Sequence, residues 1–223
     1  MHRVAIMQPY FFPYAGYYRL FAAADLFVVL DSVQFPRRGW VHRNRLRRAD
    51  GELDWITLPL RKAPQTAAIR DLEFREDDGG WAVEQRARFP LLAAPPRTIA
   101  GLVDHALRPD GRPLDQLVGG LSATTALLGL ERPMVLASSL AVDPGLRAQA
   151  LIIALARAAG ATTYVNLAGG GELYAPADFR AAGLDLQILP PYRGDHASIL
   201  ERLAEAGADA VAADIRDQSA VVS

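Results

Sequence analysis

The chain alternates between short runs of strand length and longer segments whose apolar residues recur at helical spacing. The strand-like runs cover residues 4–7, 26–30, 133–136, 162–166 and 185–189. The segments with a helical pattern cover residues 14–24, 81–89, 114–129, 143–157, 179–183 and 198–206. Runs such as 26–30, which lack a polar face, are typical of parallel sheets that are covered on both sides. The pattern therefore predicts an α/β fold, with a Rossmann-like parallel sheet and flanking helices.

Four weaker signals complete the predicted organisation. Residues 55–60 are expected to form another strand, and residues 69–74 an edge strand. Residues 95–113 are rich in proline and are expected to cap and connect the helices on either side of them. Asp143-Pro144 marks a helix start, because an N-cap residue is followed by proline at the first turn. We expect a single α/β domain over residues 1–223, with a possible helical insertion at about 79–130.

The first strand, helix and second strand form a βαβ unit with polar groups at its strand ends. Gln8 follows the first strand, and Asp31 follows the second. Ligands of such folds bind beyond the carboxyl ends of the strands. The connecting loop holds two prolines, which make it rigid, and a group of aromatic residues. We predict that the loop is a ligand platform, with Gln8, Tyr10, Tyr14 and Tyr17 as substrate-binding residues. The alternative is that these rings are core aromatics.

A cationic stretch between residues 37 and 48 adds groups that bind anions. The planar forks of its arginines suit phosphate or carboxylate. The predicted substrate-binding residues are Gln34, just before this stretch, and Arg38, Trp40, Arg43, Asn44 and Arg45 within it. Arginines interleaved with an aromatic ring also occur in RNA-binding proteins. The overall balance of 24 basic and 25 acidic residues argues against nucleic acid as a partner.

Three residues are candidates for acid–base chemistry: His42, His196 and Asp31. The arginines around His42 should lower its pKa and keep its ring neutral, as a base requires. Ser138 follows a strand, but no Gly-x-Ser-x-Gly motif surrounds it. A substrate hydrogen bond or a helix cap is therefore favoured over a nucleophile. The glycines at 169–171 could cradle an anion, or they could form a flexible connector.

Several classes of protein are excluded or disfavoured. The absence of cysteine rules out disulfides, thiolate nucleophiles and Cys-ligated zinc. No histidine pair has metal-ligand spacing, so neither a metal nor another cofactor is expected. The run at residues 4–7 is too short for a signal-peptide core, and no window is long and apolar enough for a membrane span. A cytoplasmic protein that does not act on membranes is expected.

The motifs at the strand ends resemble the WbqC-like family. The resemblance rests on Met7-Gln8-Pro9-Tyr10 with Pro13 and Gly16-Tyr17, on Asp31 to Phe35, on Trp40 to Arg45, on Gly160-Ala161 with Tyr164 and Tyr174-x4-Phe179, and on His196 to Leu200. It adds Tyr164 and Ser198 as substrate-binding candidates. His42 stands where the resemblance leads us to expect asparagine. Membership would imply a role in assembling surface sugars or secondary metabolites.

The N-terminal unit also has a weaker similarity to nucleotidyltransferases. In those proteins a His-x-Gly-His motif follows the first strand and contacts nucleotide phosphates. The corresponding residues here are Tyr14-Ala15-Gly16-Tyr17. Tyrosine cannot bring positive charge to a phosphoryl group, so nucleotidyl transfer by this motif is disfavoured. The similarity nevertheless predicts a nucleotidyltransferase-like N-terminal part.

These observations leave three functions open. The favoured one is a biosynthetic group-transfer enzyme, which moves an acyl or aminoacyl unit to an amine or hydroxyl of a sugar-like or peptide-like metabolite. The second is a nucleotide-dependent transferase or ligase, and the third is a non-catalytic binding protein. The expected partner is a small-molecule substrate. Its donor could be activated by a carrier protein or by a nucleotide, and the sequence leaves both open.

Overall fold

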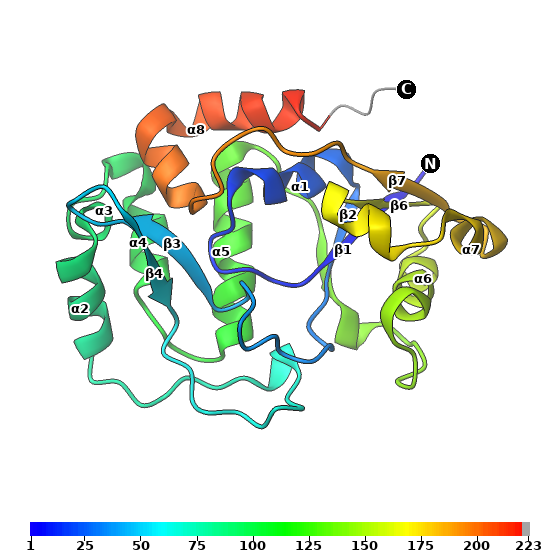
Figure 1. The fold of residues 1–223 in the computed structure, drawn as a ribbon, viewed down its shortest axis with the longest axis horizontal. Coiled ribbons are helices and arrows are strands. Elements are labelled where there is room, and N and C mark those ends of the chain that lie inside the picture. The colour runs from blue at the N-terminus through cyan, green and yellow to red at the C-terminus, as the bar shows by residue number, and fades with distance from the viewer. Residues whose placement is uncertain (220–223) are drawn as a thin grey trace.

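The computed structural model describes residues 1–219, and a parallel sheet lies at its centre (Figure 1). The strands of this sheet are all parallel to their neighbours. Across the sheet, the order is β5 (Met134–Leu136), β2 (Leu26–Val29), β1 (Arg3–Met7), β6 (Thr163–Asn166) and β7 (Asp185–Ile188). Numbered along the chain, this order is 3-2-1-4-5, as in one half of a Rossmann fold. The predicted fold class is confirmed.

Helices cover both faces of the sheet, and each face has its own hydrophobic cluster. One cluster joins Phe27 and Val29 of β2 to the helices α1 (Arg19–Ala23), α5 (Pro113–Leu128) and α8 (Ile199–Asp217). The other joins Val28 to α6 (Ala148–Ala158) and α7 (Pro176–Ala181). Because successive side chains of a strand point to opposite faces, both faces of β2 are buried. This explains the apolar run from which the strand was predicted.

The long connection from β2 to β5 contains a hairpin and several helices. The hairpin pairs β3 (Arg43–Arg47) with β4 (Leu53–Thr57) in antiparallel register. The helices of the connection before α5 are α2 (Gly80–Arg88), α3 (Pro90–Ala93) and α4 (Ala100–Ala106). Their buried side chains belong to the same cluster that covers the sheet. The single domain and the helical insertion at 79–130 stay predictions.

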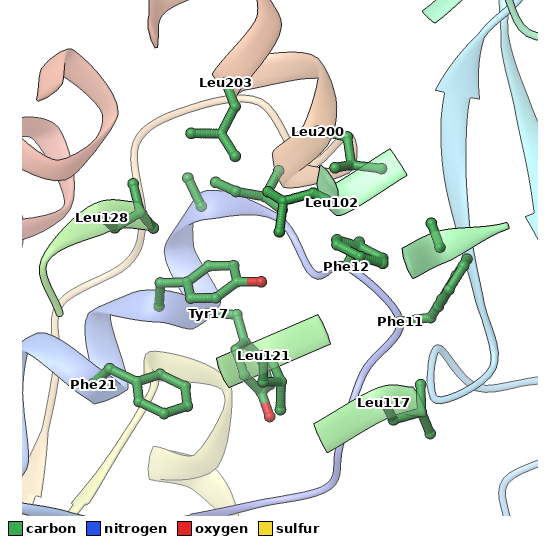
Figure 2. Packing of buried hydrophobic residues seen from close by; sticks show 14 of the residues in the cluster. Phe11, Phe12, Tyr17, Phe21, Leu102, Leu117, Leu121, Leu128, Leu200 and Leu203 are labelled. Carbon is green, nitrogen blue, oxygen red and sulfur yellow. The ribbon is translucent and has the colours of Figure 1, made fainter. Parts of the chain in front are cut away.

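The loop that follows β1 sends two of its rings into the core. Figure 2 shows Phe11 and Phe12 beside Leu117 of α5 and Leu200 of α8. Both rings are almost fully buried. Phe12 has a φ angle of 43°, in the left-handed region that residues with a side chain seldom adopt. The surrounding contacts must therefore hold this backbone in place.

Three predictions about local structure are wrong in whole or in part. Residues 69–74 do not form an edge strand: Ile69–Asp71 is a 3-10 turn, and Phe74 makes only an isolated bridge to Leu60. The strand predicted over 55–60 starts at Leu53 and ends at Thr57, before a proline that cannot donate to a ladder. The connection at 95–113 contains α4, because the apolar residues between its prolines are buried against α5.

Two more elements differ from their predicted form. The helix expected from Asp143-Pro144 begins at Ala148, because the aspartate caps a tight turn instead: its Oδ1 accepts from Gly145 N at 2.7 Å. The cationic stretch contains β3, which was not predicted. Along β3, Asn44 and Leu46 are buried while the arginines between them are half-exposed. This alternation is that of a strand with one covered face.

Candidate functional site

A cavity of about 510 Å³ lies at the carboxyl ends of β2 and β5. Its walls come from the segment after β2, from the turn at Ile69–Asp71 and from the segment between β5 and α6. The first two walls are joined by backbone hydrogen bonds from Ile69 N to Val33 O at 3.0 Å and from Phe35 N to Ala67 O at 2.8 Å. The polar lining residues are Ser32, Gln34, Thr66, Arg70, Ser138, Asp143 and Arg147. Strand ends of this kind are where α/β folds bind ligands.

Asp31 and Ser138 form a pair at the edge of this cavity. The carboxylate of Asp31 is fully buried and accepts two hydrogen bonds from Ser138. Its Oδ2 accepts from the serine Oγ at 2.6 Å, and its Oδ1 accepts from the serine N at 2.9 Å. Because the hydroxyl proton points to Asp31, the lone pairs of the exposed Ser138 Oγ are left for a ligand. The pair can therefore accept a hydrogen bond from an amine or hydroxyl.

The cavity also holds two arginines that the sequence did not single out. Arg147 donates hydrogen bonds from Nη1 to Leu146 O at 2.7 Å and to Pro144 O. Among the described residues, no carboxylate forms an ion pair with it. Arg70 has only a long contact of 3.7 Å to Asp71. Both side chains are exposed and carry donors that could bind an anion. They stand isolated in the sequence, so no cluster signals them.

A second group of predicted residues meets on the β3–β4 hairpin. The Arg43 guanidinium lies 4.2 Å from the ring centroid of Trp55, and that of Arg45 lies 5.4 Å from the centroid of Trp40. The two tryptophan rings are 4.9 Å apart, and Tyr10 is 5.8 Å from Trp40. Trp55 was missed because it was assigned to a strand, although it directly faces Arg45 in the ladder. The result is an aromatic surface with stacked cations.

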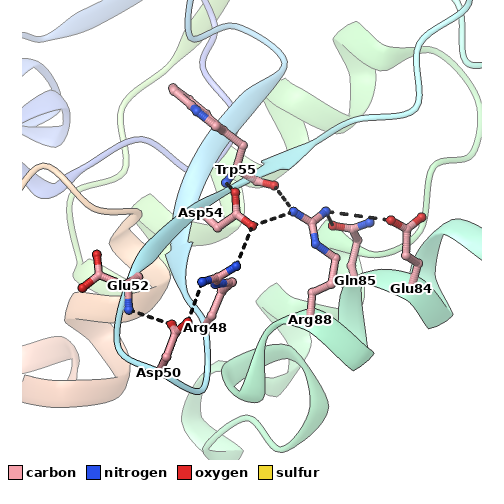
Figure 3. A network of polar contacts seen from close by, with 8 residues as sticks. All are labelled: Arg48, Asp50, Glu52, Asp54, Trp55, Glu84, Gln85 and Arg88. Atoms are coloured by element: carbon pink, nitrogen blue, oxygen red, sulfur yellow. Dashed lines mark hydrogen bonds and ion pairs between the residues drawn. The ribbon is translucent and has the colours of Figure 1, made fainter.

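The hairpin is held by polar contacts of its own. Arg43 donates from Nε to Gly39 O at 2.9 Å and from Nη2 to Arg38 O at 2.6 Å. At the other strand, Asp54 accepts from Arg88 of α2 at 3.0 Å (Figure 3). Figure 3 also shows Arg48 between Asp54 and the turn. Arg43 therefore closes the loop that precedes β3, a task that the sequence did not suggest. Arg38 itself is exposed.

Asn44 and Ser198 hold the aromatic loop in place. Asn44 is fully buried, and its Nδ2 donates to Phe11 O at 3.2 Å and to Phe12 O. Ser198 is also buried; its Oγ donates to Phe12 O at 2.9 Å and caps α8 by accepting from Leu200 N at 3.3 Å. Both side chains are occupied by backbone groups of this chain. They support the loop, and their contact with a substrate stays a prediction.

His42 has the electronic state that the sequence predicted. Its pKa is lowered to about 4, first by burial and second by Arg43. The prediction that the ring is neutral is confirmed, although burial has a larger effect than the neighbouring cation. The ring packs edge-on against Phe35, with 4.9 Å between centroids, and Nδ1 has no partner among the described residues. His42 does not line the strand-end cavity.

Tyr14 and His196 meet at a third place. Their rings are 4.7 Å apart, and Tyr192 lies 5.7 Å from Tyr14. Gly16 is buried under this group: a Cβ atom built on it would lie 2.6 Å from Tyr192 Cγ. The segment that corresponds to His-x-Gly-His is thus covered by the chain itself. The nucleotidyltransferase-like character of the N-terminal part is not confirmed.

Two more predicted residues lie inside the protein. Tyr164 of β6 is fully buried and stacks on Phe179 of α7, on the face of the sheet opposite the aromatic loop. Its contacts are those of a core side chain, and its role in binding a substrate stays a prediction. Tyr17 is buried as well, and its hydroxyl donates to Gln8 O at 2.8 Å. The Gln8 side chain is half-buried at the end of β1.

The structure therefore distributes the predicted residues over separate places. Asp31, Gln34 and Ser138 meet at the strand-end cavity. The hairpin group and the pair of Tyr14 and His196 lie outside its lining. The expectation of one cavity shared by rings and guanidinium groups is wrong for this cavity. Within residues 1–219, no cluster of three or more acidic, histidine or cysteine side chains could hold a metal ion.

Fold and strand-end site together define a Rossmann-like α/β protein. The model of the WbqC-like protein family matches residues 8–196, and the chain belongs to this family. The "Uncharacterized protein Rv1507c" of Mycobacterium tuberculosis is 42% identical over 60 residues, which are 27% of this chain and 26% of that protein. The chain thus matches about a quarter of the length of this relative. No solved structure matches. Within the described residues, no helix has the length and apolar character needed to cross a bilayer.

Proposed function

We propose that the chain is a biosynthetic group-transfer enzyme that moves an acyl or aminoacyl unit from an activated donor to a sugar-like or peptide-like metabolite. The observation that carries this proposal is the strand-end cavity, where Ser138 bonded to buried Asp31 lies beside two arginines. An acceptor and an anionic donor need these two kinds of group. Membership in the WbqC-like family is compatible with a biosynthetic role.

The arginines would hold the donor. Arg70 and Arg147 present guanidinium groups to the same cavity, and a phosphate or carboxylate would bind between them. Gln34 adds an amide: its Nε2 donates to Gln65 O at 2.7 Å, which leaves its carbonyl oxygen for a ligand N–H or O–H. Holding both reactants in one cavity supplies much of the acceleration that transfer from an activated donor requires.

Ser138 and Asp31 would remove the acceptor proton. The acceptor hydroxyl or amine donates to Ser138 Oγ while its lone pair attacks the acyl carbon. As the new C–O or C–N bond forms, its proton passes to Ser138 Oγ and the serine proton passes to Asp31 Oδ2, 2.6 Å away. The donor's leaving group departs with the electron pair of the bond that breaks. Asp31 is then the general base, and it acts through one hydroxyl.

The test is a product screen with matched variants. A panel of acyl thioesters and aminoacyl adenylates is incubated with amino sugars and amino acids, and products are detected by mass spectrometry. With a productive pair, Ser138→Ala should lower kcat by roughly 100-fold or more. Arg147→Met should mainly raise the donor KM, whereas Arg75→Met, outside the cavity, should change neither. A Ser138→Ala enzyme with an unchanged kcat would contradict the proposal.

A nucleotide-dependent transfer is the second candidate. In the 3-2-1-4-5 strand order, the connections of β1 and β6 leave toward opposite sides of the sheet. Rossmann-like proteins with this order bind nucleotides at that point. ATP and CTP should then raise the melting temperature of the protein and be consumed during turnover. If no donor, thioester or nucleotide reacts but a partner binds tightly, the chain is the non-catalytic binding protein instead.

A further inference from the structure

The largest fully buried side chain of the described region is an arginine, Arg19. It is the first residue of α1 and is 1% exposed. Its Nη1 donates to Pro190 O at 2.9 Å. Its Nε and Nη2 have no hydrogen-bond partner, and no carboxylate in residues 1–219 forms an ion pair with it. A buried charge is normally paired, because its loss of hydration is otherwise uncompensated.

The two unpartnered nitrogens form one edge of the guanidinium group. This Nε–Nη2 edge presents two parallel N–H bonds, the geometry that carboxylate and phosphate oxygens accept together. In contrast to exposed arginines, whose charged end reaches water beyond an apolar stem, the charged end of Arg19 is itself buried. Burial lowers the pKa of Arg19 from its usual value. The chain therefore keeps an anion-binding edge in a place that is unfavourable for an unpaired cation.

No group in the described part of the chain places a negative charge in contact with this edge. Burial raises the pKa of Tyr14, and it raises that of Tyr192 to about 12, so neither hydroxyl ionises near neutral pH. The negative charge of Asp214 raises the pKa of Arg19, but the oxygens of Asp214 accept from Tyr192 at 3.3 Å and from Gln218 at 2.8 Å. Among the described residues, the charge of Asp214 acts on Arg19, but no carboxylate contacts the Nε–Nη2 edge.

A segment without helix or strand, residues 190–196, covers Arg19. It follows β7 and carries Tyr192, whose ring lies against Gly16 and over the start of the helical region. Apart from half-buried Tyr192, its residues are exposed. An exposed ion pair of 3.0 Å between Asp195 and Arg47 ties down its far end. Arg19 therefore lies one layer below the surface, near the carboxyl ends of β1, β6 and β7.

We propose that Arg19 is the anion-binding residue of a second ligand site, in which the Nε–Nη2 edge binds an oxyanion of a substrate, a phosphate or a carboxylate. The segment 190–196 moves aside to admit this group, and His196 and Arg193 add positive or polar groups at the rim. The site lies at the strand ends next to the divergence of β1 and β6, whereas the cavity of the proposed function lies at β2 and β5. It does not depend on the proposed reaction.

The test measures thermal unfolding and calorimetric binding with inorganic phosphate and with acetate, each compared with chloride at equal ionic strength. The wild-type midpoint should rise by several degrees with phosphate, with acetate or with both, and the responding anion identifies the chemistry. Arg19→Met should lower this rise by the part that comes from Arg19, yet its ligand-free midpoint should equal or exceed that of the wild type. This substitution replaces an unpaired buried cation with an apolar side chain of similar length. Anion binding is therefore weakened while the ligand-free protein is not destabilised.

Three further variants secure the result. Arg19→Lys retains the charge but loses the fork, so its anion affinity should fall at least tenfold; this variant decides the matter if Arg19→Met does not fold. Arg132→Met removes an arginine that also donates to a backbone carbonyl, at 2.8 Å from Ala24 O, and should leave the anion response intact. Arg147→Met removes an anion-binding arginine of the strand-end cavity, so any part of the response that Arg19→Met leaves should disappear when the two changes are combined. A wild-type protein that responds no more than to chloride, or an Arg19→Lys protein that binds as tightly as the wild type, overturns the proposal.

Discussion

Asn44 and Ser198 donate to the same backbone oxygen, that of Phe12, and this shared acceptor gives a sharp test of how the aromatic loop is held. We consider the variants Asn44→Ala and Ser198→Ala and their combination. In each single variant the Phe12 carbonyl keeps one donor. In the double variant the Phe12 carbonyl keeps neither donor, although the Phe12 backbone must stay at its unfavourable φ angle of 43°. The two substitutions should therefore be strongly non-additive.

The magnitudes follow from the contacts. Ser198→Ala removes a hydrogen bond with a net value of about 1 kcal/mol and a helix cap worth about 1 kcal/mol, so about 2 kcal/mol is expected. Asn44→Ala removes the donor to Phe11 O and the acceptor of Arg45 N at 2.8 Å. With buried groups left unpaired, it should cost about 3 kcal/mol. The double variant should exceed the sum by about 1–2 kcal/mol, the cost of one orphaned buried carbonyl.

Urea unfolding followed by circular dichroism gives the four free energies of unfolding. A second cycle serves as the control and combines Asn44→Ala with Thr124→Ala. The Thr124 hydroxyl donates to a different carbonyl, that of Gly120 at 2.8 Å, so these two changes should add to within about 0.5 kcal/mol. If the Asn44 and Ser198 changes also add within that limit, the shared acceptor does not hold the loop.

Two other predictions concern His42 and Arg43. The folded pKa of His42 is about 4, below its usual value of 6.5, so the unfolded chain binds the proton more readily; stability should fall by at most about 3 kcal/mol as the pH drops from 6.5 to 4. Urea unfolding across this range should show that His42→Phe lowers the slope, and an equal slope in both proteins would contradict the low pKa. Arg43→Met should lower the free energy of unfolding by about 2 kcal/mol and shift tryptophan emission, because it loses two hydrogen bonds and the stack on Trp55. Arg38→Met is the matched control, and equal effects of the two changes would show that Arg43 does not close the loop.

The central sheet could be predicted because its signals are local. A strand such as 26–29 is buried on both faces, and an uninterrupted apolar run records this in the sequence. The hairpin strand 43–47 was missed for the opposite reason. Its alternating pattern was present, with Asn44 and Leu46 at the covered positions, but the arginines between them also fit a ligand-binding stretch. A charge pattern alone does not distinguish these two uses.

The site was predictable only where strand ends specify it. Asp31 and Ser138 each follow a strand, and parallel neighbours bring such residues to one edge although 107 positions separate them. Arg147 lies on an irregular connection, so its arrival at the same cavity depends on a path that no local pattern encodes. The contacts of Tyr164 and Ser198 likewise depend on which face of the sheet, and which helix, covers each residue.

The residues that support the aromatic loop explain why binding motifs and structural motifs overlap in this chain. The loop must leave β1, turn through the unfavourable backbone of Phe12 and enter the helical region that starts at Ala15. Buried amide and hydroxyl donors from β3 and α8 make this path stable. The same path fixes the end of β1 beside the end of β2, where Asp31 orients Ser138. A substitution in the supports should therefore disturb the strand-end cavity from a distance, with a loss of stability preceding any loss of binding.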